Sequence, residues 1–175
     1  TAEERRLHKL AVLFQMTYIG APMVYYGDEA GMWGANDPCC RKPMVWPDLS
    51  YAPEAARPDG MVADTPDAVA FDQTLFDLYR GLIHLRNNTS ALRRGDFTAL
   101  LADNDREVYA FQRSHEGQTV LVVINRSEQA QPVVLPAGPA DRYLDLINGG
   151  EELLLQDGAL AAEIPPLWSR VMLAV

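Results

Sequence analysis

Residues 25–46 concentrate side chains that could take part in chemistry. Asp28 and Glu29 are adjacent carboxylates, a type that transfers protons or attacks carbon. Neighbours in an extended segment point to opposite faces, so this pair cannot converge on one bond without a sharp turn. We therefore expect both acids to bind loop amides or an arginine. Asp37 can accept and Arg41 can donate hydrogen bonds, either to a polar ligand or to each other.

The elements around this segment set its position. Apolar residues at helical spacing predict a helix over about residues 2–18, which Gly20 and Pro22 end. The short apolar run 23–26 that follows is typical of a strand covered on both faces. No periodicity is present over residues 27–66, so we expect a long functional loop whose part after residue 51 is the more mobile.

A second apolar face at helical spacing predicts a helix over about residues 68–86. After it, apolar residues recur at every second position instead. Tight-turn residues separate eight short runs of alternating polarity, which predicts an antiparallel β-sandwich from residue 93 onward. The expected strands are 97–101, 108–112, 119–124, 131–135, 143–147, 152–155, 159–164 and 169–175. We place the domain boundary between residues 92 and 93.

Composition excludes several classes of function. The net charge of −9 over 175 residues argues against nucleic-acid and anionic-membrane partners, which need clustered Lys and Arg. No apolar run is long enough to span a bilayer. Cys39 and Cys40 are adjacent and unsuited to a disulfide framework, and the three histidines lack metal spacing, so we expect free thiols and no metal site. The absence of a signal peptide and of a disulfide framework favours a cytoplasmic location.

Four segments together resemble the C-terminal portion of the α-amylase family of glycoside hydrolases. The residues that carry the resemblance are Gly20-Ala21-Pro22-Met23-Val24-Tyr25-Tyr26-Gly27-Asp28-Glu29, then Gly31-Met32-Trp33-Gly34, the spaced Asp37-Pro38, Arg41, Pro43-Met44 and Trp46, and finally 91–97 with 122–127. Within the family they look most like the neopullulanase, cyclomaltodextrinase and maltogenic amylase group. The resemblance implies an α+β fragment: residues 1–92 form the tail of a (β/α)8 TIM barrel, namely a helix, strand eight with its long 27–66 loop, and a helix. Residues 93–175 form the antiparallel β-sandwich C-terminal domain.

The same resemblance implies the chemistry. Family members hydrolyse, and some transfer, α-1,4-glucosidic bonds with retention, using two carboxyl groups about 5–5.5 Å apart. Those groups follow barrel strands that these residues do not contain, and a whole barrel needs about 250 residues. We expect the C-terminal piece of a larger enzyme, with no catalytic residue, no cofactor and no activity alone. By resemblance Asp37 and Arg41 contact sugar hydroxyls and Trp33 stacks on a sugar face, while salt-bridge and packing roles for them stay open; Trp46 is assigned to packing.

The expected partners are an α-glucan or maltooligosaccharide and the missing N-terminal part of the barrel. An apolar strand exposed by the absence of its neighbours predicts self-association of the isolated chain. Two alternatives remain open. The β-sandwich could be an accessory carbohydrate-binding module that uses Trp168, or the chain could belong to a non-catalytic, amylase-like scaffold protein.

Overall fold

The computed structural model describes residues 2–34, 37–57, 59–136, 138 and 140–175. The chain divides into two compact units, one formed by Thr1–Pro22 with Leu82–Val175 and the other by Met23–Gly81. Each unit is described by itself. None of the helices formed by the described residues is long and apolar enough to cross a membrane.

Helix α1 (Ala2–Thr17) opens the first unit and confirms the helix predicted over residues 2–18. Its buried side chains are Leu10, Val12, Leu13, Met16 and Thr17. The hydroxyl of Thr17 donates to the carbonyl of Leu13 at 2.9 Å, which satisfies a carbonyl of the last turn. Gly20 then adopts φ +99°, a backbone conformation that a side chain would strain.

The second predicted helix begins later than its apolar pattern indicated. Helix α2 spans Gln73–Asn88 and is followed by the short α3 (Ser90–Arg94). Asp72 marks the start, because its carboxylate accepts the backbone N–H of Leu75 at 2.9 Å and so caps the first turn. Phe71, which the apolar face was expected to include, therefore precedes the helix.

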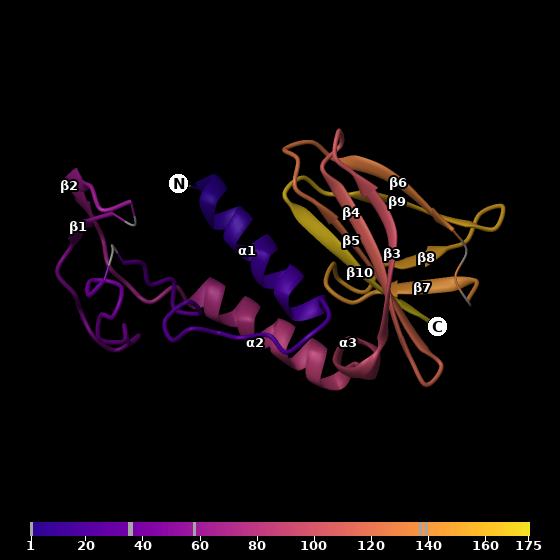
Figure 1. Ribbon diagram of the computed structural model, residues 1–175, viewed down its shortest axis with the longest axis horizontal. Coiled ribbons are helices and arrows are strands. Elements are labelled where there is room, and N and C mark those ends of the chain that lie inside the picture. Colours follow the sequence, from indigo (N-terminus) through magenta and orange to yellow (C-terminus); the bar gives the residue numbers. More distant parts are fainter. Residues whose placement is uncertain (1, 35–36, 58, 137, 139) are drawn as a thin grey trace. The chain divides into compact units, whose positions relative to one another are not determined.

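All eight strands predicted after residue 93 are present. They are β3 (Asp96–Asp103), β4 (Val108–His115), β5 (Gln118–Asn125), β6 (Gln131–Pro136), β7 (Arg142–Asp145), β8 (Glu152–Leu154), β9 (Ala159–Ile164) and β10 (Trp168–Ala174). Six of them form an antiparallel sheet in the order β3-β4-β5-β10-β7-β8, and β6 pairs with β9 in a second sheet (Figure 1). The architecture is mostly antiparallel β-sheet with a few helices, as a C-terminal β-sandwich domain requires.

One apolar core joins the two sheets. It draws side chains from β4 to β10: Val108, Ala110, Leu121, Val123, Val133, Leu135, Tyr143, Leu153, Leu160, Ile164 and Met172. The opposite face of the six-stranded sheet is also covered, because α1 contacts β5 and β10 and α3 contacts β4 and β5 (Figure 1). Strand β5 is consequently buried on both faces, and each fully buried Val contributes about 1.5–3 kcal/mol.

Two tight turns follow their sequence signals. Glu116 and Gly117 both have positive φ between β4 and β5, which is the geometry of a two-residue hairpin turn. Asp157 and Gly158 repeat this combination before β9. Local turn chemistry therefore sets the register of these strands.

The predicted strand over residues 23–26 was wrong. Residues 21–25 form no regular element, and Met23 is 71% exposed. A strand needs hydrogen-bonding neighbours, and a parallel barrel strand needs one on each side; the described residues offer this segment none.

The predicted structureless stretch after residue 51 was also wrong in part. It contains a small hairpin of β1 (Glu54–Ala56) and β2 (Val62–Asp67). Its turn is closed by hydrogen bonds from Arg57 N–H to the carbonyl of Met61 and from Gly60 N–H to the carbonyl of Arg57, each 2.9 Å. The two strands are too short and too polar to show a period.

Candidate functional site

The acid- and aromatic-rich segment begins with a compact turn in the second unit. Backbone N–H groups of Ala30 and Met32 donate to the carbonyl of Gly27 at 3.1 and 2.9 Å. Gly27 has φ +90°, and a Cβ there would lie 2.4 Å from the sulfur of Met32. Only glycine fits this position, so the turn fixes where the next side chains emerge.

Asp28 and Glu29 are both partly buried in this turn. The carboxylate of Glu29 accepts the N–H of Gly27 at 3.0 Å, which is the amide-binding role expected of it. Burial, together with the charges of Asp28 and Glu29, raises the pKa of Tyr79 to about 12. The two acids thus form a locally negative region that keeps a neighbouring phenol neutral.

The side chain of Trp33 makes two contacts, a hydrogen bond from its indole N–H and a cation–π contact on its ring face. Its Nε1 donates to the carbonyl of Ala56 at 3.3 Å, and Lys42 Nζ lies 5.7 Å from the ring centroid. Lys42 also forms an ion pair with Glu54, whose hydrogen bonds from Lys42 and from the Ala56 amide lower the pKa of the Glu54 carboxyl. Sequence reasoning missed the Lys42–Glu54 pair, because no local pattern links residues on either side of the loop.

Asp37 and Arg41 form the ion pair that was one of their two expected roles. Arg41 Nη2 lies 2.5 Å from Asp37 Oδ1, while the side chains remain 60% and 68% exposed, respectively. The N–H of Arg41 donates to the carbonyl of Pro38 at 3.0 Å, which closes a turn between them. The pair therefore presents one acceptor and one donor group to solvent from a closed loop.

Gly34 lies in the sequence between Trp33 and the Asp37–Arg41 ion pair. A Cβ at Gly34 would lie 2.7 Å from Cα of Cys40, so the backbones of the two segments are in close contact. Cys39 and Cys40 are exposed and free, as expected. Trp46 was expected to pack, but it is 53% exposed. Residues 35 and 36 of this loop, and residue 58 of the 27–66 segment, lie outside the described residues.

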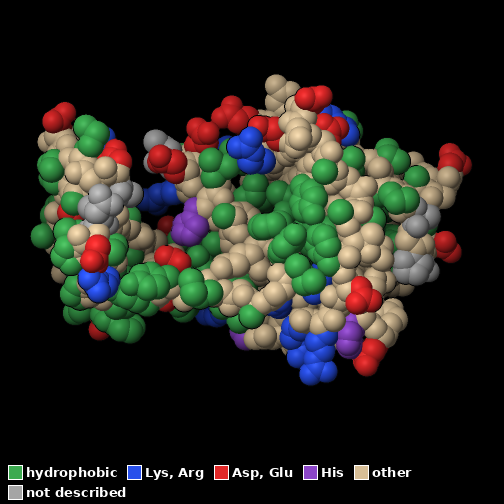
Figure 2. All heavy atoms as spheres, in the orientation of Figure 1, with side chains coloured by type: hydrophobic (Ala, Val, Ile, Leu, Met, Phe, Trp, Pro, Cys, Tyr) green, Lys and Arg blue, Asp and Glu red, His purple; other side chains and the backbone are tan. Residues whose placement is uncertain are grey.

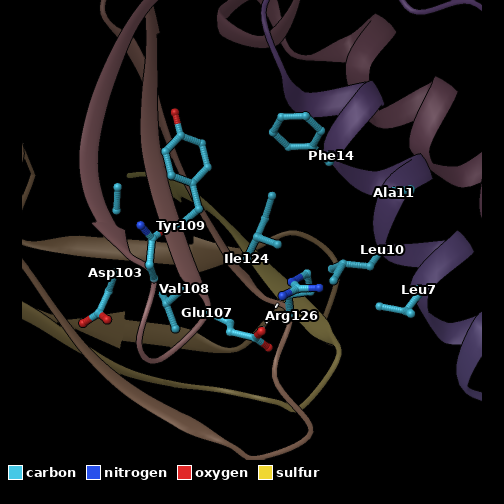
Figure 3. Close-up of a pocket in the computed structure, with 12 residues that line it drawn as sticks. Leu7, Leu10, Ala11, Phe14, Asp103, Glu107, Val108, Tyr109, Ile124 and Arg126 are labelled. Carbon is cyan, nitrogen blue, oxygen red and sulfur yellow. Dashed lines mark hydrogen bonds and ion pairs between the residues drawn. The ribbon is translucent and has the colours of Figure 1, made fainter.

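A separate cavity of about 480 Å³ lies in the first unit between α1 and the six-stranded sheet (Figure 3). Apolar side chains such as Leu10 and Phe14 form its helical wall, and Figure 2 shows hydrophobic side chains gathered there. Its acids are engaged: Asp103 accepts from Arg106 Nε at 2.7 Å, and Glu107 is paired with Arg126. This hollow consequently offers no free pair of carboxylates.

Trp168, the residue named for an accessory carbohydrate site, lies at the start of β10. Its ring is partly exposed, and its Nε1 donates to Asn148 Oδ1 at 2.9 Å. Asn148 in turn donates to the buried carboxylate of Asp145, which pairs with Arg170 at 2.8 Å. Trp168 is thus part of a polar network that joins β7 to β10. Among the described residues no group of three or more His, Cys, Asp or Glu side chains could hold a metal ion.

Comparisons with known proteins find relatives over most of the chain. Residues 97–167 match the family described as Maltogenic Amylase, C-terminal domain. Neopullulanase 2 of Thermoactinomyces vulgaris is 36% identical over 166 residues, which covers 94% of this chain and 25% of that enzyme. A cyclomaltodextrinase of Geobacillus thermopakistaniensis is 34% identical over 158 residues, covering 90% and 24%. A solved cyclomaltodextrinase structure superposes with a TM-score of 0.75 at 29% identity, over 97% of this chain and 26% of that one. The chain spans about a quarter of the length of the curated relatives it matches.

Proposed function

Because the chain corresponds to the C-terminal portion of an α-amylase-family glycoside hydrolase of the neopullulanase, cyclomaltodextrinase and maltogenic amylase group, we propose that it serves an enzyme acting on α-glucans. In the proposal that enzyme hydrolyses, or hydrolyses and transfers, α-1,4-glucosidic bonds with retention of configuration. The observation that carries the proposal is 36% identity to a neopullulanase over 94% of the chain, loop and sandwich included.

In this proposal the loop that holds Asp37, Arg41 and Trp33 forms part of the sugar-binding wall. A sugar presents paired hydroxyls, each both donor and acceptor, which suit a carboxylate beside a guanidinium. The exposed Asp37–Arg41 ion pair supports this role, because both side chains remain accessible to a ligand. Trp33 contributes apolar contact beside them, with Lys42 covering part of its ring.

The β-sandwich has a supporting role in the proposal. In the proposal α1 corresponds to the seventh barrel helix, and it packs on the six-stranded sheet. Buried hydrogen bonds from Arg113 reinforce this packing. In the proposal the sandwich therefore supports α1 within the first unit.

Residues upstream of Ala2 in the longer enzyme supply the reacting carboxylates. Retaining hydrolysis needs a nucleophile and an acid/base group about 5–5.5 Å apart. Glu29 accepts the amide N–H of Gly27, which gives this carboxylate a structural role in the turn. We therefore expect the 175-residue chain to be inactive by itself and to depend on the rest of the barrel.

The test compares product formation from β-cyclodextrin and from maltotriose by this chain and by a chain extended upstream through the whole barrel. Maltose or glucose formed only by the extended chain supports the proposal. Turnover by the short chain that Asp28→Asn or Glu29→Gln abolishes would place the chemistry in the loop instead. No turnover of either substrate by a folded extended chain would favour a non-catalytic scaffold.

A further inference from the structure

The first unit contains a second cavity, of about 820 Å³, whose charge differs from that of the chain as a whole. Four arginines line it, Arg86, Arg93, Arg94 and Arg113, whereas Asp96 is the one acid among the described residues of its lining. Figure 2 shows Lys and Arg side chains gathered along the lower edge of this unit, in the region of α2 and α3. A local excess of positive charge in a chain of net charge −9 requires a cause.

Two of these arginines are buried without a carboxylate. Arg86 is 7% exposed and donates to the carbonyls of Met16, Tyr18 and Gly20. Arg113 is 1% exposed and donates to the carbonyls of Thr17 and Gly95. Neither has an ion-pair partner in the part of the chain that the structure describes.

Burial lowers the pKa of both guanidinium groups, and the charge of Arg86 lowers that of Arg113 further. Backbone carbonyls accept hydrogen bonds from both groups but carry no full negative charge, and Arg113 Nε is buried without a hydrogen-bond partner in the described part of the chain. Buried charges are ordinarily paired, since an unpaired charge in a region of low dielectric constant is costly. The wall of the cavity therefore holds two neighbouring positive charges that face backbone carbonyls and no carboxylate of the described residues.

The other two arginines are available to a ligand. Arg93 and Arg94 lie in the last turn of α3 and are exposed. Neither forms an ion pair with another described residue. Their backbone is held in place, because Gly95 N–H donates to the carbonyl of Ala91 at 2.9 Å. A Cβ at Gly95 would lie 2.3 Å from that carbonyl oxygen, so the turn that carries the two arginines is tightly packed.

We propose that this cavity binds a doubly charged oxyanion, as inorganic phosphate or as the phosphoryl group of a sugar phosphate. Arg93 and Arg94 contact the oxyanion directly, since the planar guanidinium group matches phosphate with two parallel hydrogen bonds. Arg86 and Arg113 add a fixed positive potential from the wall. The proposal does not depend on the function proposed for the loop of the second unit.

The experiment is calorimetric titration of the 175-residue chain with inorganic phosphate, glucose 6-phosphate and glucose at about physiological ionic strength. We expect both phosphates to bind, glucose to give no heat, and the double variant Arg93→Gln/Arg94→Gln to weaken phosphate at least about tenfold. Equal affinity for the two phosphates identifies the free anion as sufficient. Tighter binding of glucose 6-phosphate identifies the sugar phosphate as the preferred source.

The matched control is Arg57→Gln/Arg80→Gln, which removes the same charge from arginines outside the cavity. Circular dichroism of both double variants verifies that they are folded. Absence of phosphate binding by the unaltered chain, or equal weakening by the two double variants, would overturn the proposal. Loss of binding in the chain extended through the barrel would overturn it for the longer enzyme.

Discussion

Arg113 of β4 donates a hydrogen bond from its Nη1 to the carbonyl oxygen of Thr17, the last residue of α1, at 3.0 Å. Its Nη2 donates to the carbonyl of Gly95 at 2.9 Å. One side chain therefore ties the end of the first helix to the entry of the six-stranded sheet, across 96 positions of sequence.

Replacing Arg113 by Met should destabilise the first unit. The change leaves the carbonyls of Thr17 and Gly95 buried and unpaired, and hydrogen bonds to charged groups contribute about 1.5–3 kcal/mol each. We expect the free energy of unfolding to fall by about 2–4 kcal/mol in urea denaturation. Arg80→Met, at an exposed arginine, serves as the control. A loss below about 0.5 kcal/mol at Arg113 would show that α1 is held by apolar packing alone.

Asp37→Asn should affect substrate binding more than stability. An exposed ion pair contributes about 0–1 kcal/mol, so urea denaturation should detect little change. In the chain extended through the barrel, we expect KM for maltotriose to rise about tenfold, because a charge-assisted hydrogen bond to a sugar hydroxyl is lost.

The control for that substitution is Asp48→Asn, which removes an exposed carboxylate from the same loop segment. Equal KM values for Asp37→Asn and the unaltered enzyme would show that the Asp37–Arg41 pair only closes the loop. A rise in KM with both variants would point to a general charge effect.

Tyr79 should make stability depend on alkaline pH. Its hydroxyl titrates near 10.0 when unperturbed and at about 12 in the folded chain. Between these values the unfolded chain loses its proton first. The stability that neutral Tyr79 contributes is therefore complete below about pH 10 and falls as the pH rises toward 12.

Urea denaturation at about pH 9 and about pH 11.5 measures this effect in the unaltered chain and in Tyr79→Phe. Other tyrosines with raised pKa, such as Tyr109 and Tyr143, contribute to both proteins, so the difference between them isolates Tyr79. We expect the alkaline loss to be smaller in Tyr79→Phe by up to about 2 kcal/mol. Identical alkaline losses would mean that folding does not raise the pKa of Tyr79.

The β-sandwich should fold without the residues that precede α3. Its shared core lies entirely between Val108 and Met172. We expect a chain of residues 90–175 to unfold cooperatively on heating, at a lower temperature than the 175-residue chain, because the face that α1 covers becomes exposed. A non-cooperative transition would contradict this.

The 175-residue chain should self-associate. Large apolar side chains of residues 19–26 and 46–62 are exposed, among them Met23 at 71% and Val62 at 75%. Sedimentation velocity of the 175-residue chain should therefore show concentration-dependent association. A monomeric 175-residue chain across the concentration range would refute this expectation.

The sequence predicted the eight sandwich strands because their signals are local. Alternating polarity and turns such as Glu116-Gly117 determine both the strand and its partner within a few residues. The strand predicted at residues 23–26 depended on neighbours that the described residues do not contain. The β1–β2 hairpin was missed because three- and six-residue strands of polar composition show no period.

In the candidate site, too, contacts between residues close in sequence could be expected, and contacts that depend on the folded loop could not. The ion pair of Asp37 and Arg41 was one of the two roles that their residue types left open, because a carboxylate and a guanidinium suit both a salt bridge and sugar hydroxyls. The contacts of Trp33 with Lys42 and Ala56 could not be predicted, because they join segments that approach only when the loop is folded.

The position of β10 between β5 and β7 has a consequence for biosynthesis. Of the six strands in its sheet, the ribosome makes β10 last, yet this strand occupies the interior. Until it emerges, the nascent domain has two separate strand groups, with the inner edges of β5 and β7 unpaired. Chaperone binding during translation is therefore most useful in the interval before Trp168–Ala174 leaves the exit tunnel, and a release from the ribosome before that point yields an open, aggregation-prone sheet.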